Sequence, residues 1–401
     1  MRRTTILGAV LSAGLTVGGA ILAVSGGTAQ AATLPNNWYG AAPYVMPLDN
    51  DPPDLGPVMD ATSQKSFMLA FILAPNSGGC TATWDGTAPL SDPTVAGVVS
   101  KVRAKGGDVS VSIGGFGGTK LGQTCSSPAA TAAAYQQVIN QYQLKAIDFD
   151  LEEPEYENLT AVNNELGAAQ ILQNNNPGLY VSITTAGTPS GTGFFGQNVL
   201  TNSKNLGFTP NNFAIMPFDN GFSGGGASQV SALEAFHGLL MNTFGWSSAF
   251  AYNHEGVSLM NGRSDAGEMF PQSEFTTVFN YATSHGLSRF TFWSINRDRQ
   301  CSPPDNNGRT SGTCSSVAQA SWDFTKFTAR FAGATPPQSP PPTTGSPTPG
   351  TCSAPPWNST TAYTGGMQVS YGGHTWTAKW WTQGDTPGNN SQDVWTDNGS
   401  C

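Results

Sequence analysis

Charged residues are scarce in this sequence: Asp, Glu, Lys and Arg make up 11 % of its 401 residues. Positive charge is scarcer than negative, with 17 Lys and Arg against 26 Asp and Glu, and the formal net charge is −9 at pH 7. A nucleic-acid-binding protein needs clustered basic side chains to neutralise phosphates. The composition therefore argues against nucleic acid as a partner.

Residues that commonly bind metal ions are also few. The chain has four histidines, scattered along its length, and no CxxC pair. A structural zinc site needs several Cys or His ligands at close spacing. We therefore expect no metal site and no cofactor.

Long apolar runs are confined to the N-terminal region. Arg2 and Arg3 precede an apolar stretch at residues 6–24, and Ala29-Gln30-Ala31 has the small-x-small pattern of a cleavage site. No later stretch reaches the roughly 18 to 20 apolar residues of a membrane-spanning helix. We expect residues 1–31 to be a signal peptide, and the mature protein to be secreted, extracellular, free of the membrane and monomeric.

An even number of cysteines follows this segment, which in an exported protein indicates three disulfides. Many pairings of six cysteines are possible. Because the last two bracket the C-terminal segment, we expect neighbours along the chain to pair. The cysteines are Cys80, Cys125, Cys301, Cys314, Cys352 and Cys401.

Residues 334–351 are rich in Pro, Thr, Ser and Gly and carry no apolar periodicity. Such a segment favours extended backbone and cannot bury a core, so it is typical of a linker. It separates a large domain, residues 32–333, from a small one, residues 352–401.

The large domain alternates short apolar strands with amphipathic helices. Residues 66–74 and 108–113 are predicted strands. Between them, Asp92 and Pro93 begin a predicted helix whose valines recur at helical spacing. Further strands are expected at 146–151, 180–184, 213–218 and 289–293, and further helices at 228–241 and 274–284. Such repeated units over about 300 residues predict an α/β fold, either a (β/α)8 TIM barrel, which the length favours, or a doubly wound sheet.

Acidic residues alternate along one predicted strand, at Asp148, Asp150 and Glu152. Side chains alternate faces in a strand, so the three carboxylates point one way and the apolar residues between them the other. Clustered carboxylates push one another's pKa values apart, and one can stay protonated near neutral pH. Because active sites of barrels lie at the carboxyl ends of the strands, we expect Glu152 to be a proton donor at the mouth of the barrel.

Residues 145–152, KAIDFDLE, resemble the DGxDxDxE signature of glycoside hydrolase family 18 chitinases. Other landmarks of that family follow in order over nearly all of residues 38–333. Residues 112–115 resemble its SxGG motif, residues 216–219 its MxYD motif, and residues 257–270 and 290–298 the end of the barrel in bacterial members.

This resemblance implies a chitinase that cleaves β-1,4 bonds between N-acetylglucosamine units with retention of configuration. Glu152 would act as general acid and base. The substrate's own acetamido oxygen would attack the anomeric carbon and form an oxazolinium ion, as in this family's exception to the two-carboxylate scheme.

The resemblance also implies roles for residues around Glu152. Asp150 would orient the acetamido group, and Asp148 and Ser112 would support Asp150 through hydrogen bonds. The subsite of the attacked sugar would be formed by Met216, Asp219 and Trp293.

Two departures from the family pattern leave alternatives open. Lys145 and Ala146 replace the Asp-Gly that opens the signature, and Phe218 stands where many members have a tyrosine that binds the acetamido oxygen. Tyr252 or Tyr39 could supply the missing hydroxyl. A catalytically weak chitin-binding protein and an endo-β-N-acetylglucosaminidase are the alternative functions.

A competing motif lies at residues 221–225, which match the G-x-S-x-G nucleophile elbow around Ser223. Asp265 and His285 follow in the order of an esterase triad. An elbow is a tight turn, however, and a long glycine-rich connection separates the predicted strand from the helix here. We therefore expect a glycine-rich loop rather than an esterase site.

The small domain is crowded with aromatic residues, more than so small a core can absorb, and exposed aromatic patches indicate binding. Residues 378–382, AKWWT, resemble the AxWWT motif of carbohydrate-binding module families 5 and 12. That resemblance implies a small β-rich module, closed by a disulfide, that binds chitin or a related β-1,4 polysaccharide. Its binding strip would be Tyr363, Trp380 and Trp381, and its core would include Trp357, Trp376 and Trp395.

Overall fold

The computed structural model describes residues 34–335, 354–388 and 393–400. The chain divides into two compact units, Met1–Pro337 and Gln338–Cys401, which we describe separately. The predicted signal peptide lies outside the described residues, as does nearly all of the predicted linker. Within the described residues, no helix is both long and apolar enough to cross a bilayer.

The first unit is built around eight parallel strands whose order in the sheet follows their order in the chain. The first and last of these strands contact each other, so the sheet nearly closes into a barrel. This confirms the TIM-type barrel and excludes a doubly wound sheet, whose strand order would reverse. The strands are β1 (Tyr44–Val45), β2 (Ser66–Leu73), β4 (Asp108–Gly114), β5 (Ala146–Leu151), β6 (Tyr180–Thr188), β8 (Asn212–Met216), β9 (Glu255–Met260) and β12 (Arg289–Trp293).

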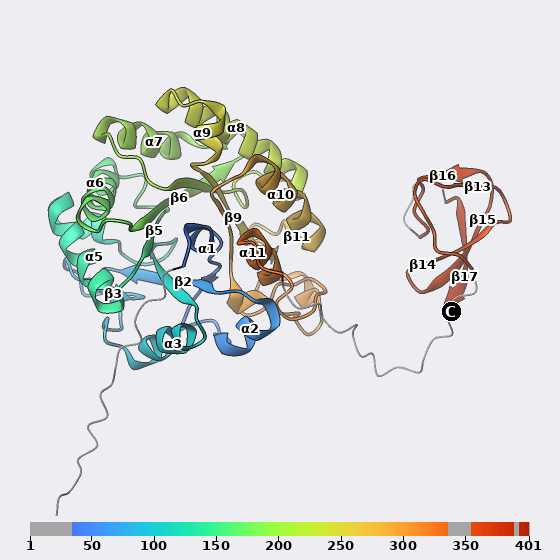
Figure 1. Cartoon of the computed structure of the whole chain (residues 1–401), viewed down its shortest axis with the longest axis horizontal. Coiled ribbons are helices and arrows are strands. Elements are labelled where there is room, and N and C mark those ends of the chain that lie inside the picture. Colours follow the sequence, from blue (N-terminus) through green and yellow to red (C-terminus); the bar gives the residue numbers. More distant parts are fainter. Residues whose placement is uncertain (1–33, 336–353, 389–392, 401) are drawn as a thin grey trace, which may run out of the picture. The chain divides into compact units, whose positions relative to one another are not determined.

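Helices surround this sheet on the outside (Figure 1). The longer ones are α2 (Leu55–Thr62), α3 (Pro93–Ala104), α5 (Pro128–Tyr142), α6 (Leu159–Asn175), α7 (Phe194–Leu206), α8 (Gly226–Phe244), α10 (Gln272–His285) and α11 (Thr325–Phe331). Short elements complete the unit: α1 (Asn36–Gly40), α4 (Leu121–Thr124), α9 (Ser248–Tyr252), η1 (Ile295–Arg297), η2 (Asn306–Gly308), β3 (Thr83–Trp84), β7 (Gly191–Thr192), β10 (Gly262–Arg263) and β11 (Met269–Phe270).

Local sequence explains where helix α3 begins. The Asp92 carboxylate accepts hydrogen bonds from the backbone N–H groups of Thr94 at 2.8 Å and Val95 at 3.2 Å. Pro93 occupies the first turn, where no backbone donor is needed. The predicted start of this helix is confirmed.

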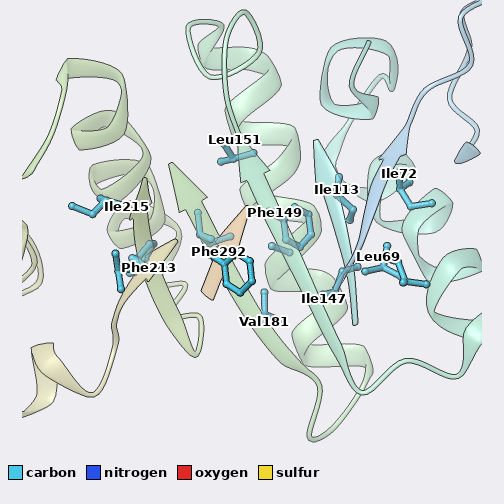
Figure 2. Close-up of a cluster of buried hydrophobic side chains, with 14 of the residues drawn as sticks. Leu69, Ile72, Ile113, Ile147, Phe149, Leu151, Val181, Phe213, Ile215 and Phe292 are labelled. Atoms are coloured by element: carbon cyan, nitrogen blue, oxygen red, sulfur yellow. The ribbon is translucent and has the colours of Figure 1, made fainter. Parts of the chain in front are cut away.

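The predicted alternation of strand β5 is also confirmed. Ile147, Phe149 and Leu151 are buried in the large apolar cluster between the sheet and the helices (Figure 2). Asp148 and Asp150 therefore point the other way, into the barrel. This single register decides which side chains reach the interior.

Some predicted boundaries shift by a few residues. Strand β8 ends at Met216 rather than at residue 218, because Pro217 has no N–H to continue the ladder. Helix α8 begins at Gly226 and ends at Phe244, so it extends beyond the predicted 228–241 at both ends.

Two of the expected disulfides are confirmed, Cys80–Cys125 and Cys301–Cys314. Cys352 and Cys401 lie outside the described residues, so their predicted bond stays a prediction.

The second unit is β-rich, and its described strands are antiparallel. They are β13 (Ala362–Tyr363), β14 (Gln368–Tyr371), β15 (His374–Ala378), β16 (Thr382–Gln383) and β17 (Trp395–Ser400). Its small core consists of Tyr363, Val369, Ala378, Val394 and Trp395.

Candidate active site

A cavity of about 710 Å³ opens where the barrel strands end. Glu152 follows β5, Met216 ends β8 and Trp293 ends β12, so the cavity lies at the carboxyl ends of the strands, where barrel enzymes place their active sites. Its lining includes Tyr44, Phe71, Phe116, Asp150, Glu152, Met216, Phe218, Asp219, Ser258, Asp265 and Trp293.

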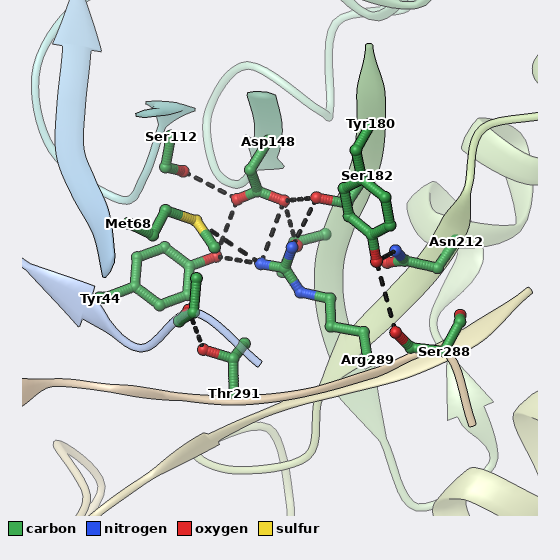
Figure 3. Close-up of polar contacts among 12 residues, drawn as sticks. Tyr44, Met68, Ser112, Asp148, Tyr180, Ser182, Asn212, Ser288, Arg289 and Thr291 are labelled. Atoms are coloured by element: carbon green, nitrogen blue, oxygen red, sulfur yellow. Dashed lines mark hydrogen bonds and ion pairs between the residues drawn. The ribbon is translucent and has the colours of Figure 1, made fainter. Parts of the chain in front are cut away.

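Asp148 lies beneath this cavity, and its carboxylate is surrounded by donors (Figure 3). A guanidinium nitrogen of Arg289 lies 3.2 Å from its Oδ1. Such a set of partners stabilises the ionised carboxylate. The hydroxyl donors are Tyr44 at 2.9 Å, Ser112 at 2.8 Å, Ser182 at 2.6 Å and Thr184 at 2.9 Å.

Asp150, one layer higher on β5, has a different environment. It is buried, and its Oδ1 has no hydrogen-bond partner among the described residues. Burial raises its pKa well above the usual range, and the charges of Glu152 and Asp148 raise it further. Asp150 is therefore shifted toward its protonated form, and it has an oxygen available to a ligand in the cavity.

Glu152 lies at the mouth of the barrel. Burial, and then the charge of Glu153, raise its pKa to about 7, and Lys120 acts in the opposite direction. Near neutral pH this carboxyl is divided between its protonated and ionised forms, as a group that both donates and accepts protons requires.

Aromatic rings form one wall of the cavity. The ring of Trp293 stacks on Phe71 with centroids 5.4 Å apart and an interplanar angle of 10°. Tyr44 lies beside both rings, with its centroid 5.8 Å from that of Trp293 and 6.1 Å from that of Phe71. A flat apolar surface of this kind suits the apolar face of a sugar ring.

Asp219 holds two loops of the cavity together. Its carboxylate accepts a hydrogen bond from the backbone N–H of Ala266 at 2.7 Å. Its backbone has a positive φ of 65°, a conformation more common for Asp than for most residues. The structure thus brings all seven predicted barrel residues to this cavity or directly beneath it.

The predicted sources of a replacement hydroxyl for Phe218 are wrong. The Tyr39 hydroxyl donates to Asp108 at 2.8 Å, at the opposite end of the barrel. Tyr252 stacks on His237 in the helical layer, with centroids 3.6 Å apart. The hydroxyl-bearing side chains that line the cavity are instead Tyr44 and Ser258.

The esterase motif does not assemble into a triad. His285 ends α10 at the bottom of the barrel, bonded to the backbone oxygen of Tyr281 at 3.0 Å. Asp265 lines the cavity at the top. The expected glycine-rich loop connects β8 to α8.

Sequence reasoning missed Tyr44 and Arg289, which complete the surroundings of Asp148. The sequence RFTFW places an arginine at the start of a mostly apolar strand. This could have indicated a buried ion pair, because a buried guanidinium needs an acidic partner. Tyr44 gave no signal, because its strand is only two residues long.

The aromatic residues of the second unit divide into exposed and buried groups. Trp380 and Trp381 are 50 % and 62 % exposed. Tyr363 is buried: its ring packs against Trp395, and its hydroxyl accepts from the N–H of Asn358 at 2.7 Å. Its predicted place in the exposed strip is wrong, because the small core needs an aromatic ring there.

The predicted core tryptophans pack as expected. Trp395 is buried in the core, and Trp357 and Trp376 are partly buried against it.

Comparison with known families identifies the second unit. Residues 356–396 match carbohydrate-binding module family 5/12. This confirms the resemblance seen in the AKWWT segment.

The barrel has chitinases among its relatives. Over 274 residues the chain is 26 % identical to "Probable bifunctional chitinase/lysozyme" of Escherichia coli (strain K12), matching 64 % of this chain and 30 % of that protein. Over 274 residues it is also 26 % identical to "Endochitinase 11" of Metarhizium anisopliae, matching 64 % of this chain and 52 % of that protein. The chain thus spans from about a third to about half of these relatives' lengths.

Solved structures confirm the fold. The catalytic domain of the hyperthermophilic chitinase from Pyrococcus furiosus superposes with a TM-score of 0.65 at 23 % identity, covering 73 % of this chain and 94 % of that one. The barrel is thus the fold of a known chitinase catalytic domain, and the relatives that match most of this chain are chitinases. More particularly, the chain is similar to these two chitinases, and its residues 356–396 match carbohydrate-binding module family 5/12.

The Arg289–Asp148 pair gives a stability prediction. Arg289→Met leaves a buried carboxylate without its cation, and we expect the free energy of unfolding to fall by roughly 3–5 kcal/mol. The double variant Arg289→Met with Asp148→Asn removes both charges and should recover part of this loss. Urea unfolding followed by tryptophan fluorescence measures both values. A loss below about 1 kcal/mol in the single variant would contradict the importance of the pair.

Proposed function

We propose that the protein is a chitinase that hydrolyses β-1,4 bonds between N-acetylglucosamine units by a retaining, substrate-assisted mechanism. The observation that carries this proposal is the position of Glu152. It is a carboxyl with a pKa near neutrality, at the mouth of the barrel, beside the buried Asp150 and an aromatic wall.

In the first step, Glu152 donates its proton to the glycosidic oxygen as the bond to the anomeric carbon breaks. The substrate's acetamido oxygen forms the new bond to that carbon and gives an oxazolinium ion. In the second step, the ionised Glu152 takes a proton from water as the water oxygen attacks the same carbon, and the bond from that carbon to the acetamido oxygen breaks. Two displacements retain the configuration.

The environment of Asp150 supports an acetamido nucleophile rather than a carboxylate. A carboxylate nucleophile must be ionised, whereas burial and two neighbouring carboxylates raise the pKa of Asp150 and disfavour its ionised form. Its unpartnered oxygen is available to hydrogen-bond the acetamido group and hold it in place.

Phe218 lines the cavity without offering a hydroxyl, which is the observation that favours a second candidate, a catalytically weak chitin-binding protein. Turnover of chitin separates the two candidates. An endo-β-N-acetylglucosaminidase would use the same carboxyls, and it would cleave the glycans of glycoproteins in preference to chito-oligosaccharides.

We also propose that the second unit binds chitin through Trp380 and Trp381. Family 5/12 membership supports carbohydrate binding, and both rings are exposed enough to stack on a sugar chain.

Secretion of the protein as a monomer is part of the same proposal. The two described disulfides fit an oxidising compartment, and an insoluble polymer outside the cell is accessible only to an exported enzyme.

Replacing the proposed acid tests the mechanism. Glu152→Gln should lower hydrolysis of colloidal chitin by 10²-fold or more, on the order of what a general acid contributes, because an amide cannot donate the required proton. Glu157→Gln, on the same loop but exposed, is the matched control and should keep wild-type activity. Equal, negligible rates in the wild type and Glu152→Gln would favour the binding-protein alternative.

The pH profile gives a second test. Glu152 must be protonated in the free enzyme, so kcat/KM on a soluble chito-oligosaccharide should fall as pH rises through about 7. Below this pKa Glu152 keeps its proton and the enzyme is active. Above it Glu152 is ionised, and the rate is lost. A rate that stays constant well above this value would exclude Glu152 as the acid.

The exposed tryptophans give a third test. Trp380→Ala and Trp381→Ala should each weaken binding of the protein to insoluble chitin by roughly tenfold or more, as truncation of a central tryptophan does in other interfaces. Tyr363→Phe removes a buried hydroxyl and leaves the exposed surface intact, so its binding should match the wild type. Depletion assays with chitin measure all three, and weaker binding only in Tyr363→Phe would overturn the assignment.

A further inference from the structure

A fully buried lysine, Lys120, lies behind the wall of the cavity. Its Nζ donates to three successive backbone oxygens, those of Phe116 and Gly117 at 3.0 Å each and of Gly118 at 3.3 Å. These three residues line the cavity together with Asp150 and Glu152. The loop that carries them follows β4, and Phe116 at its tip is 73 % exposed.

The hydrogen-bond geometry requires the charged form of Lys120. An ammonium has three N–H donors, one for each of the three carbonyl oxygens. A neutral amine has only two N–H groups, and its lone pair would face an oxygen. Burial lowers the pKa of Lys120, whereas Glu155, Glu152 and Asp150 act against that effect.

Lys120 is also the cation that acts on the proposed acid. The other charged groups acting most strongly on Glu152 are carboxylates: Glu153 on its own loop, Asp219 after β8 and Asp265 after β9. All three raise the pKa of Glu152, and Lys120 lowers it. When Glu152 gives up its proton, the new negative charge forms among these carboxylates, and the ammonium offsets it.

Two further buried carboxyls, Glu155 and Glu165, lie in this region, and Glu155 acts on Lys120. Glu165 accepts hydrogen bonds from the N–H of Gly122 at 2.6 Å and the hydroxyl of Tyr135 at 2.8 Å. Burial raises the pKa of both carboxyls, and the Glu165 charge raises that of Glu155 further. Burial therefore disfavours the ionised form of both carboxyls, which weakens their effect on the Lys120 ammonium.

We propose that Lys120 is a positioning residue for the reaction: its ammonium fastens residues 116–118 as a wall of the cavity and stabilises the ionised Glu152 formed when the leaving oxygen is protonated. This inference rests on the proposed function for its second half only. The fastening of the loop is independent of any activity.

The charge is tested by Lys120→Met and Lys120→Arg. Lys120→Met removes the cation, so Glu152 should hold its proton to higher pH. The pH at which kcat/KM falls on the alkaline side (the alkaline limb) should then rise by on the order of one unit, and kcat should be lower. Lys120→Arg keeps the charge and should return the limb to the wild-type position.

Lys101→Met is the matched control. It makes the same substitution at a half-exposed lysine on the outer helix α3, and the limb should not move. If Lys120→Met fails to fold, Lys120→Gln, whose amide keeps two donors for the carbonyls, takes its place. The electrostatic role would be refuted if kcat/KM of the neutral variants fell at the same pH as in the wild type. It would also be refuted if Lys120→Arg shifted this pH as much as the neutral variants do.

The fastening is tested by chymotrypsin, which cuts after exposed aromatic residues in mobile segments. In Lys120→Met, cleavage between Phe116 and Gly117, detected by mass spectrometry, should be several times faster than in the wild type under conditions where both are folded. Equal cleavage rates would overturn the fastening.

Failure of the proposed function has a separate signature. In that case the wild type does not hydrolyse chitin, and the proteolysis result stands alone. If the wild type is active and only the pH shift is missing, the inference about Lys120 fails and the chitinase proposal remains.

Discussion

The buried charge of Asp148 is the constraint on which the barrel interior depends. An ionised carboxylate inside a protein is costly unless donors surround it. Here they come from β1, β4, β6 and β12, so one charge joins strands from both ends of the sheet. Two of these strands, β1 and β12, also carry Tyr44 and Trp293 of the aromatic wall.

The three carboxyls along β5 differ because their depths differ. Asp148 accepts hydrogen bonds from four hydroxyl groups and pairs with Arg289. Asp150 is buried beside two other carboxyls, which raises its pKa. Glu152, at the mouth, titrates near neutrality. One strand register therefore supplies a fixed charge, a hydrogen-bond donor and a proton-transfer group, in order from the interior to the cavity.

Arg289 and Lys120 are buried cations that offset this negative charge in different ways. Arg289 forms a direct ion pair with Asp148. Lys120 donates its hydrogen bonds to backbone oxygens, and its positive charge lowers the pKa of Glu152. Backbone carbonyl oxygens accept the hydrogen bonds of the Lys120 ammonium without carrying a negative charge that would neutralise it. The positive charge remains effective at the cavity, where the proton must leave.

Local patterns in the sequence determined much of this protein. The period of two in β5, the Asp92-Pro93 helix start and the recurring strand-helix units depend on neighbours along the chain, and they predicted the barrel and the inward carboxyls. The tertiary structure alone decided that Arg289 and Tyr44 meet Asp148, that Tyr39 and Tyr252 lie away from the cavity, and that Tyr363 is buried while Trp380 and Trp381 are exposed. These outcomes depend on contacts between residues far apart in sequence, and side-chain periodicity along one strand or helix carries no information about which distant element it will face.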